Sequence, residues 1–273
     1  MFEPLEGSVR SADGTRIAYE RSGTGPALIM VDPAGRYREL GPYRSLAKLL
    51  APHFTVFVYD RRGRGASFDR QPYAPEREID DLAALIEAAG GSAFVYAMTS
   101  GALLALHAAA AGLPIPALAV FEPPIRTDDS PGEKRDLTGE LAELIARGER
   151  AGAVELFHTA IGVPAELVAG MREEQSWPAL VEIAHTFVYD CRVSDVTTLD
   201  VIASVDTPTL VIDSERGTGG LTTGWARAVA GALPDATRSS LVGQWHIVPD
   251  EDVAEVLIEY FRKFPGLGSR NGH

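Results

Sequence analysis

Short apolar runs alternate with helical patterns along most of this chain, and that alternation restricts its fold more than any other feature. The apolar runs have the length and continuity of strands buried on both faces of a sheet. They occupy residues 27–31, 54–59, 93–96, 117–121, 209–212 and 237–242. Helical spacing of apolar residues occurs at 40–50, 79–89, 101–111, 224–233 and 252–264. Ahead of the first run, an Asp13-Gly14 turn between residues 7–11 and 16–20 predicts a β-hairpin. Because strands joined through helices pair in parallel, the order predicts an α/β fold with a mostly parallel central sheet and helices on both faces.

The alternation stops between residues 126 and 205. No convincing buried strand occurs there, and the expected helices lie at 137–147, 154–161, 165–172 and 178–188. A helical insertion between two strands predicts a cap above the carboxyl edge of the sheet, where ligands bind in open α/β sheets. We therefore expect a core of residues 1–125 and 206–273 and a helical cap of residues 126–205.

Charge and motif content narrow the range of partners. The 273 residues carry a net charge of −13 at pH 7. This balance argues against nucleic acid and anionic membranes, because both are bound by clustered Lys and Arg. Nucleotide-binding glycine motifs and paired metal-ligand spacings do not occur in the sequence. The expected partner is therefore a small-molecule substrate, with no cofactor and no metal.

Cysteine usage and hydropathy indicate the compartment. Cys191 is the single cysteine, which excludes an internal disulfide and fits a reducing environment. The N-terminus shows no apolar signal run, and no stretch of sequence is long and apolar enough to cross a bilayer. We expect a cytoplasmic protein, and the abundance of alanine and arginine is typical of a bacterial one.

Residues 97–101, Ala-Met-Thr-Ser-Gly, join a strand pattern to a helical pattern through small side chains. This is the context of a nucleophile elbow, in which a sharp turn presents a side-chain oxygen at the end of a strand. The usual elbow reads G-x-S-x-G, whereas here Ala97 replaces the first glycine and Thr99 the serine. Threonine resists such a turn more than serine does, because its β-branch crowds the backbone. The segment predicts either an unusual nucleophile or a relaxed elbow without chemistry.

In this order and spacing, four segments make the chain resemble the α/β-hydrolase fold over nearly its whole length. Residues 60–67, Asp-Arg-Arg-Gly-Arg-Gly-Ala-Ser, match the D-x-R-G-x-G-x-S turn of that family. Thr99 falls at the elbow, and Glu122-Pro123-Pro124 follows the next strand. Gln244-Trp245-His246, ahead of the last helix, falls where the family places its catalytic histidine.

The resemblance implies a catalytic triad. Thr99 is the expected nucleophile by position, with Ser100 as a rival one residue later. His246 is the expected general base, because an imidazole can take up and return a proton near neutral pH. Glu122 is the favoured acid, placed as in relatives that resemble haloalkane dehalogenases, and it would orient His246. Other relatives place the acid after the strand at 209–212, where Asp213 and Glu215 are the alternatives.

The resemblance also implies an oxyanion hole formed by two backbone amides. Ser100 N–H is one, and Ala34 N–H is the other, because Pro33 has no N–H to donate. Asp32 precedes them, and an ionised carboxylate there would oppose a developing oxyanion. If burial keeps Asp32 protonated, its carboxyl becomes a proton donor instead. The alternative is a turn residue that points away and caps local amides.

Substrate choice is expected to depend on aromatic residues of the cap. Trp177, His185 and Tyr189, with Trp245 beside the histidine, suit an apolar or aromatic ligand. Packing between cap and core explains the same cap residues without any ligand, and it is the first explanation for them.

Three functions follow from these residues. The first is a cofactor-independent hydrolase of a small ester, lactone or thioester that uses Thr99 and His246. The second is a repurposed lyase, cyclase or isomerase of specialised metabolism, in which His246 and Asp32 move protons. The third is a ligand-binding protein that has lost catalysis.

Overall fold

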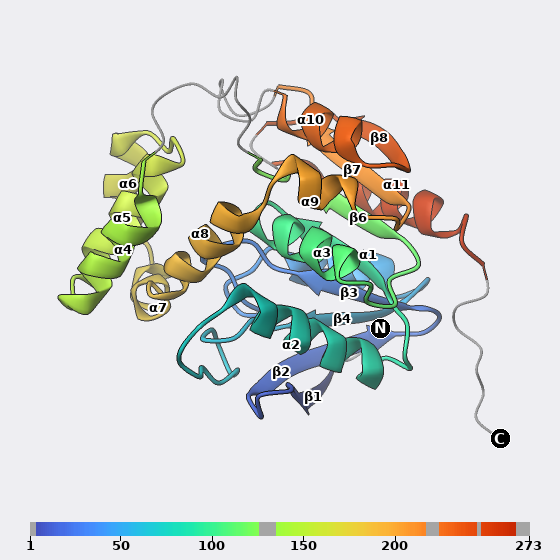
Figure 1. The fold of residues 1–273 in the computed structure, drawn as a ribbon, viewed down its shortest axis with the longest axis horizontal. Coiled ribbons are helices and arrows are strands. Elements are labelled where there is room, and N and C mark those ends of the chain that lie inside the picture. The colour runs from blue at the N-terminus through green and yellow to red at the C-terminus, as the bar shows by residue number, and fades with distance from the viewer. Residues whose placement is uncertain (1–3, 126–134, 217–223, 245–246, 266–273) are drawn as a thin grey trace.

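A computed structural model describes residues 4–125, 135–216, 224–244 and 247–265 (Figure 1). Its centre is one eight-stranded sheet with the order β1-β2-β4-β3-β5-β6-β7-β8. The strands are β1 (Leu5–Arg10), β2 (Arg16–Gly23), β3 (Ala27–Val31), β4 (Thr55–Tyr59), β5 (Phe94–Met98), β6 (Leu118–Phe121), β7 (Thr209–Ser214) and β8 (Ala236–Leu241). The β1–β2 hairpin and the β2–β4 pair are antiparallel, and all the other pairs are parallel. The predicted mostly parallel α/β sheet is confirmed.

Helices cover both faces of the sheet. The helices that follow or precede strands are α1 (Tyr43–Leu50), α2 (Pro75–Ala88), α3 (Ser100–Ala110), α9 (Leu199–Ala203), α10 (Trp225–Ala232) and α11 (Asp250–Phe261). Alternate residues of β5 divide between two apolar cores. Val95 belongs to the core that includes buried residues of α2, α3 and α10, and Phe94 belongs to the core that includes buried residues of α1 and α11. This division follows from the side-chain alternation of a strand that is buried on both faces.

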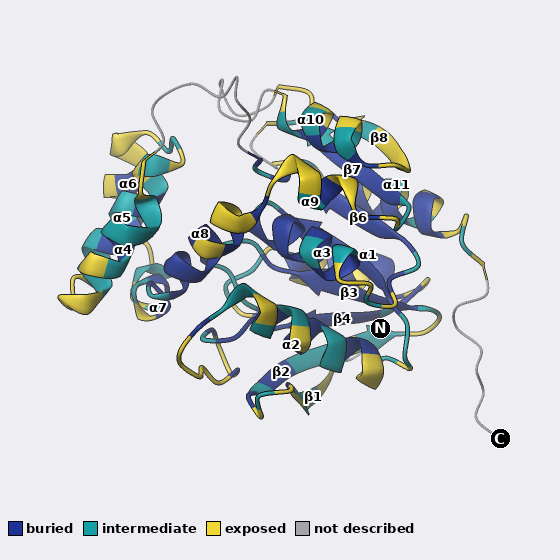
Figure 2. Ribbon diagram, viewed as in Figure 1, coloured by how far each residue is buried: buried dark blue, intermediate teal, exposed yellow. Residues whose placement is uncertain are grey.

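Between β6 and β7 the chain forms α4 (Leu137–Ala146), α5 (Arg150–Ala160), α6 (Ala165–Met171), α7 (Trp177–Glu182) and α8 (Thr186–Val196). Helices α4–α7 stand together at one end of the molecule, and α8 runs from them to α3 and α2 (Figure 1). These inserted helices share an apolar cluster that includes Leu141, Val154 and Phe187. Buried residues concentrate in the sheet, α3 and α8, whereas α4–α6 are more exposed (Figure 2).

Helix boundaries differ from the sequence expectation in places where local turns interrupt an apolar pattern. Residues 178–188 form two helices, α7 and α8, because a turn at 183–185 redirects the chain toward α3. Helix α2 begins at Pro75, earlier than expected, since a proline is favourable in the first turn of a helix. Helix α9 was not predicted, because five residues are too few to show a helical period. None of the described helices has the length and apolar character needed to cross a membrane.

Candidate active site

Thr99 occupies a strained turn between β5 and α3. Its backbone has φ 45° and ψ −118°, and its N–H donates to the Phe121 carbonyl at 2.9 Å. The Thr99 side chain does not cap α3 and is partly exposed. A β-branched residue in this conformation costs about 1–3 kcal/mol, so the fold must hold it there. The geometry is that of an elbow despite the altered motif.

The last glycine of the elbow is required by packing. A Cβ on Gly101 would lie 2.6 Å from the Val31 carbonyl oxygen and 2.7 Å from that of Asp32. The N-terminus of α3 therefore lies directly against the end of β3. This contact brings the elbow beside the segment 32–36, which follows β3.

Ala34 and Ser100, the two predicted oxyanion donors, are in contact. The Ala34 N–H donates to the Ser100 hydroxyl oxygen at 2.9 Å. Ser100 is the first residue of α3, so its own N–H has no acceptor within the helix. One predicted amide is thus already paired with a hydroxyl, which the sequence did not reveal. The Ser100 hydroxyl, the rival nucleophile predicted from the sequence, therefore faces Ala34.

Asp32 is fully buried at the end of β3. Neither of its carboxyl oxygens has a hydrogen-bond partner among the described residues. Burial raises the pKa of Asp32 to about 7, although the positive charges of Arg64 and Arg61 oppose the shift. A carboxyl in this setting is protonated in a large fraction of molecules near neutral pH.

Glu122 follows β6, the neighbour of β5. Its side chain is buried, and its Oε1 accepts hydrogen bonds from the Ser214 N–H at 3.1 Å and from the Ser214 hydroxyl. Its backbone has φ 46°. Thr99 and Glu122 are the non-glycine residues with positive φ in the part of the chain that the structure describes. Two strained residues therefore lie at the ends of adjacent parallel strands.

Asp213 and Glu215, the two alternatives to Glu122 as the triad acid, lie in different environments from Glu122. Asp213 lies in β7 and accepts from Arg238 on β8 at 3.0 Å. Glu215 is exposed, and its backbone N–H donates to the Leu241 carbonyl. The predicted general base His246 and the predicted ligand contact Trp245 lie outside the described residues.

The three residues of the inserted region that we predicted to contact a ligand, Tyr189, His185 and Trp177, each contact other protein residues. Tyr189 on α8 stacks on Tyr73 with ring centroids 3.8 Å apart, and its hydroxyl donates to Asp69 at 2.7 Å. His185 precedes α8, and its Nε2 lies 3.5 Å from an Asp69 carboxylate oxygen. Trp177 begins α7 and packs on the apolar cluster of the inserted helices. Tyr189 and Trp177 therefore have packing partners within the protein, and these contacts explain both aromatic residues without a ligand.

Comparisons with known proteins agree with this arrangement. The sequence profile of the alpha/beta hydrolase family matches residues 29–259. The chain belongs to this family. An alpha/beta hydrolase from Sphaerobacter thermophilus is 47% identical, with a TM-score of 0.86 over 93% of this chain and 100% of that chain. The fold is shared at lower identity by the esterase RhEst1 from Rhodococcus sp. (16%, TM-score 0.69, 94% and 98% covered) and by a thermophilic esterase from Thermogutta terrifontis (19%, TM-score 0.69, 95% and 98% covered).

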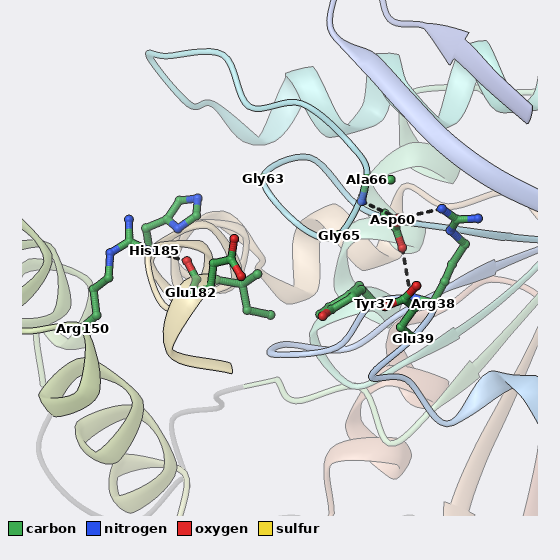
Figure 3. A pocket seen from close by; sticks show the side chains of 11 residues that line it. Tyr37, Arg38, Glu39, Asp60, Gly63, Gly65, Ala66, Arg150, Glu182 and His185 are labelled. Carbon is green, nitrogen blue, oxygen red and sulfur yellow. Dashed lines mark hydrogen bonds and ion pairs between the residues drawn. The ribbon is translucent and has the colours of Figure 1, made fainter. Parts of the chain in front are cut away.

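Two cavities in the described part of this α/β hydrolase lie near the carboxyl ends of its strands. One of about 530 Å³ separates Arg150, Glu182 and His185 of the inserted region from Tyr37 and Asp60 of the core (Figure 3). The other, of about 180 Å³, is lined by Glu122, Asp213 and Ser214 with residues of α10 and β8. Of the proposed catalytic residues, Glu122 borders the smaller cavity.

A buried network that the sequence does not predict surrounds the turn at 60–67. Arg61, Arg62 and Arg64 of the α/β hydrolase are all 0–1% exposed. Arg61 forms two hydrogen bonds of 2.8 Å with Glu78 on α2 and one of 2.7 Å with Asp190 on α8. The three arginines of this turn are the one feature of the sequence that could have indicated the network. Buried guanidinium groups require acidic partners, so burial of the turn implies that such partners exist. The acidic partners are too far away in sequence to be assigned from it.

Proposed function

We propose that this α/β hydrolase cleaves small esters, lactones or thioesters without a cofactor. The Thr99 hydroxyl attacks the substrate carbonyl, and His246 accepts its proton and passes it to the leaving group. Glu122 orients His246 and stabilises its charged form. The amides of Ser100 and Ala34 bind the oxyanion, and water then releases the acyl group from Thr99.

The observation that supports this proposal is the pair of positive φ values at Thr99 and Glu122. Strained non-glycine residues persist only where the surrounding structure enforces them, and they concentrate at functional sites. A relaxed elbow would have lost the strain at position 99. The buried Glu122 carboxylate, held by Ser214, has the fixed orientation that a triad acid needs.

The inserted helices would act as the cap of this enzyme. We infer that residues 126–205 cover the carboxyl edge of a core formed by 1–125 and 206–273. A Cβ on Gly35 would lie 3.0 Å from Phe187 and 3.1 Å from Leu180, so these helices closely approach the segment that carries Ala34. Trp177, His185, Tyr189 and Trp245 remain the proposed contacts for an apolar or aromatic substrate.

Hydrolysis of p-nitrophenyl butyrate tests the proposal. We expect turnover by the wild-type protein and a fall in kcat of at least about 100-fold in Thr99→Ala and in His246→Ala, since each removes a member of the triad. Thr24→Ala is the matched control. Thr24 is exposed in the connection between β2 and β3, so its replacement should leave kcat unchanged. Wild-type protein without turnover, or full activity in Thr99→Ala, contradicts the proposal.

A second candidate function rests on Asp32. Its buried carboxyl, whose pKa burial raises to about 7, suits a repurposed lyase, cyclase or isomerase in which Asp32 and His246 transfer protons. This candidate predicts no ester turnover. It also predicts that Asp32→Asn abolishes conversion of the native substrate, whereas Thr99→Ala only slows it.

A further inference from the structure

Arg64 binds the peptide unit that contains the Ala34 N–H. Its Nη1 donates to the Pro33 carbonyl at 2.8 Å and to the Arg36 carbonyl at 3.1 Å. The Pro33 C=O and the Ala34 N–H belong to one planar peptide group, in which they point in opposite directions. Fixing the carbonyl on one side therefore fixes the direction of the N–H on the other. Donation to the carbonyl also polarises the peptide, which strengthens its N–H as a donor.

A carboxylate from the inserted helices holds Arg64 in this position. Asp190 on α8 is 2% exposed and uses its two oxygens for two different arginines. One oxygen accepts from Arg64 Nη2 at 2.5 Å and the other from Arg61 Nη1 at 2.7 Å. The same Arg61 nitrogen donates to the Asp32 carbonyl at 3.2 Å. The segment 32–36 is thus bound at three carbonyls by two guanidinium groups that α8 anchors.

Stability alone is a weak reason for this arrangement. Arg61 and Arg64 share the Asp190 carboxylate, and Arg61 also pairs with Glu78. A buried ion network of this kind often stabilises a fold no more than apolar packing does. Arg62, in the same turn, provides a comparison. It forms hydrogen bonds of 2.7 and 2.6 Å with Asp81 on α2 and binds the Arg77 carbonyl and Asp13. Arg62 is equally buried, but its acceptors belong to other segments.

We propose that Arg64 is a positioning residue that holds the direction of the Ala34 N–H, which donates to the Ser100 hydroxyl oxygen until a substrate oxygen takes its place, and that Asp190 couples this amide to the inserted helix α8. The inference rests on the proposed function, in which this amide binds the oxyanion. Loss of one oxyanion donor costs about 100- to 1000-fold in kcat, and a misdirected donor should cost part of that. Substrate affinity should change little, because the oxyanion develops only in the transition state.

The experiment compares Arg64→Met with the matched control Arg62→Met in the full chain, using p-nitrophenyl butyrate. We expect kcat to fall about 10- to 100-fold in Arg64→Met with KM within about 3-fold, whereas kcat of Arg62→Met stays within about 3-fold of wild type. Arg64→Lys should recover most of the activity, since an ammonium group can still donate to the Pro33 carbonyl. Asp190→Asn should lower kcat in the same direction as Arg64→Met. Equal losses of kcat in Arg64→Met and Arg62→Met overturn the inference.

Amide hydrogen exchange supplies a readout that needs no turnover. In the same proteins, the peptide that contains Ala34 should exchange faster in Arg64→Met and at the wild-type rate in Arg62→Met. If the wild type hydrolyses no ester but shows this selective exchange, the proposed function fails and the positioning of the amide stands. If exchange around Ala34 is unchanged in Arg64→Met, the positioning role is wrong whatever the activity.

Discussion

At the scale of single residues, Thr99, the nucleophile that we propose, lies next to Ser100, whose hydroxyl is paired with the proposed oxyanion donor, the Ala34 N–H. Thr99 adopts the backbone of an elbow without the usual serine, and Ser100 uses its hydroxyl to bind the Ala34 N–H. This hydrogen bond satisfies a polar group that would otherwise be left without a partner before substrate arrives. It also competes with the substrate oxygen for the same donor, so stability and activity should respond to it in opposite directions.

Replacing Ser100 with alanine separates these two effects. Ser100→Ala removes the acceptor of the Ala34 N–H, which should lower the free energy of unfolding by about 1–3 kcal/mol. The freed amide can then bind the oxyanion, so we expect kcat for p-nitrophenyl butyrate to rise about 3- to 10-fold, the rate equivalent of one net hydrogen bond. Urea denaturation and steady-state kinetics on the same preparation measure both quantities. A drop in kcat would mean that the hydroxyl itself assists the reaction.

Asp32 should make stability depend on pH. Burial raises its pKa to about 7 in the folded protein, above the ordinary value of 3.8. The folded state therefore binds more protons than the unfolded state between these values, and stability falls as pH rises through this window. Asp32→Asn, which carries no charge, should gain about 2–3 kcal/mol relative to wild type between pH 5 and pH 8. Urea midpoints at the two pH values test this, with the exposed Asp80→Asn as a control that should show no such trend.

At the scale of elements, the proposed active site lies where α3 meets the end of β3. Sequence patterns predicted both elements, because each presents a continuous apolar run or a helical period. The patterns could not predict how closely the two approach, since that distance depends on the packing of α3 against the sheet. The division of residues 178–188 into α7 and α8 was also not predictable, because the turn at 183–185 interrupts an apolar pattern that continues through it.

A substitution at Gly101 tests how closely α3 approaches the end of β3. In Gly101→Ala the new Cβ would meet the Val31 and Asp32 carbonyl oxygens at less than 3 Å, so α3 or the segment after β3 has to move. We expect a loss of about 1–3 kcal/mol in stability, as for other overpacked sites, together with reduced esterase activity. Gly231→Ala is the contrasting control on α10, where a Cβ meets no atom within 4 Å. That substitution should raise stability by about 0.5–1 kcal/mol through helix propensity, and thermal unfolding of both variants decides the comparison.

At the scale of the whole molecule, the buried arginines join segments that are distant in sequence. Arg61 connects the turn after β4 with α2 through Glu78 and with α8 through Asp190. The sequence predicted the fold and the order of the site segments, because motif order and hydrophobic period are local properties. It could not predict this network, because the pairing partners of Arg61 lie 17 and 129 residues away and only the folded topology brings them together.

Two glutamate–arginine pairs differ in burial, and the contribution of each pair to stability should depend on that burial. Glu78 pairs with Arg61 and its side chain is 2% exposed, whereas Glu6 pairs with Arg38 and its side chain is 73% exposed. Glu78→Gln removes one of the two carboxylates that pair with the buried Arg61 guanidinium, so we expect it to lower stability by about 3–5 kcal/mol. Glu6→Gln makes the same chemical change in water and should cost less than about 1 kcal/mol.

The stability difference between wild type and Glu78→Gln should also depend on pH. Burial by itself would raise the pKa of Glu78, but the charge and hydrogen bonds of Arg61 outweigh it and lower the pKa below the ordinary value of 4.5. The pair therefore contributes its full stability above that value and loses it as pH falls through the lowered pKa. Urea denaturation at pH 7 and at pH 3 should show the difference shrinking at the lower pH. Equal costs for Glu78→Gln and Glu6→Gln at pH 7 would mean that the network does not hold α2 to the turn after β4.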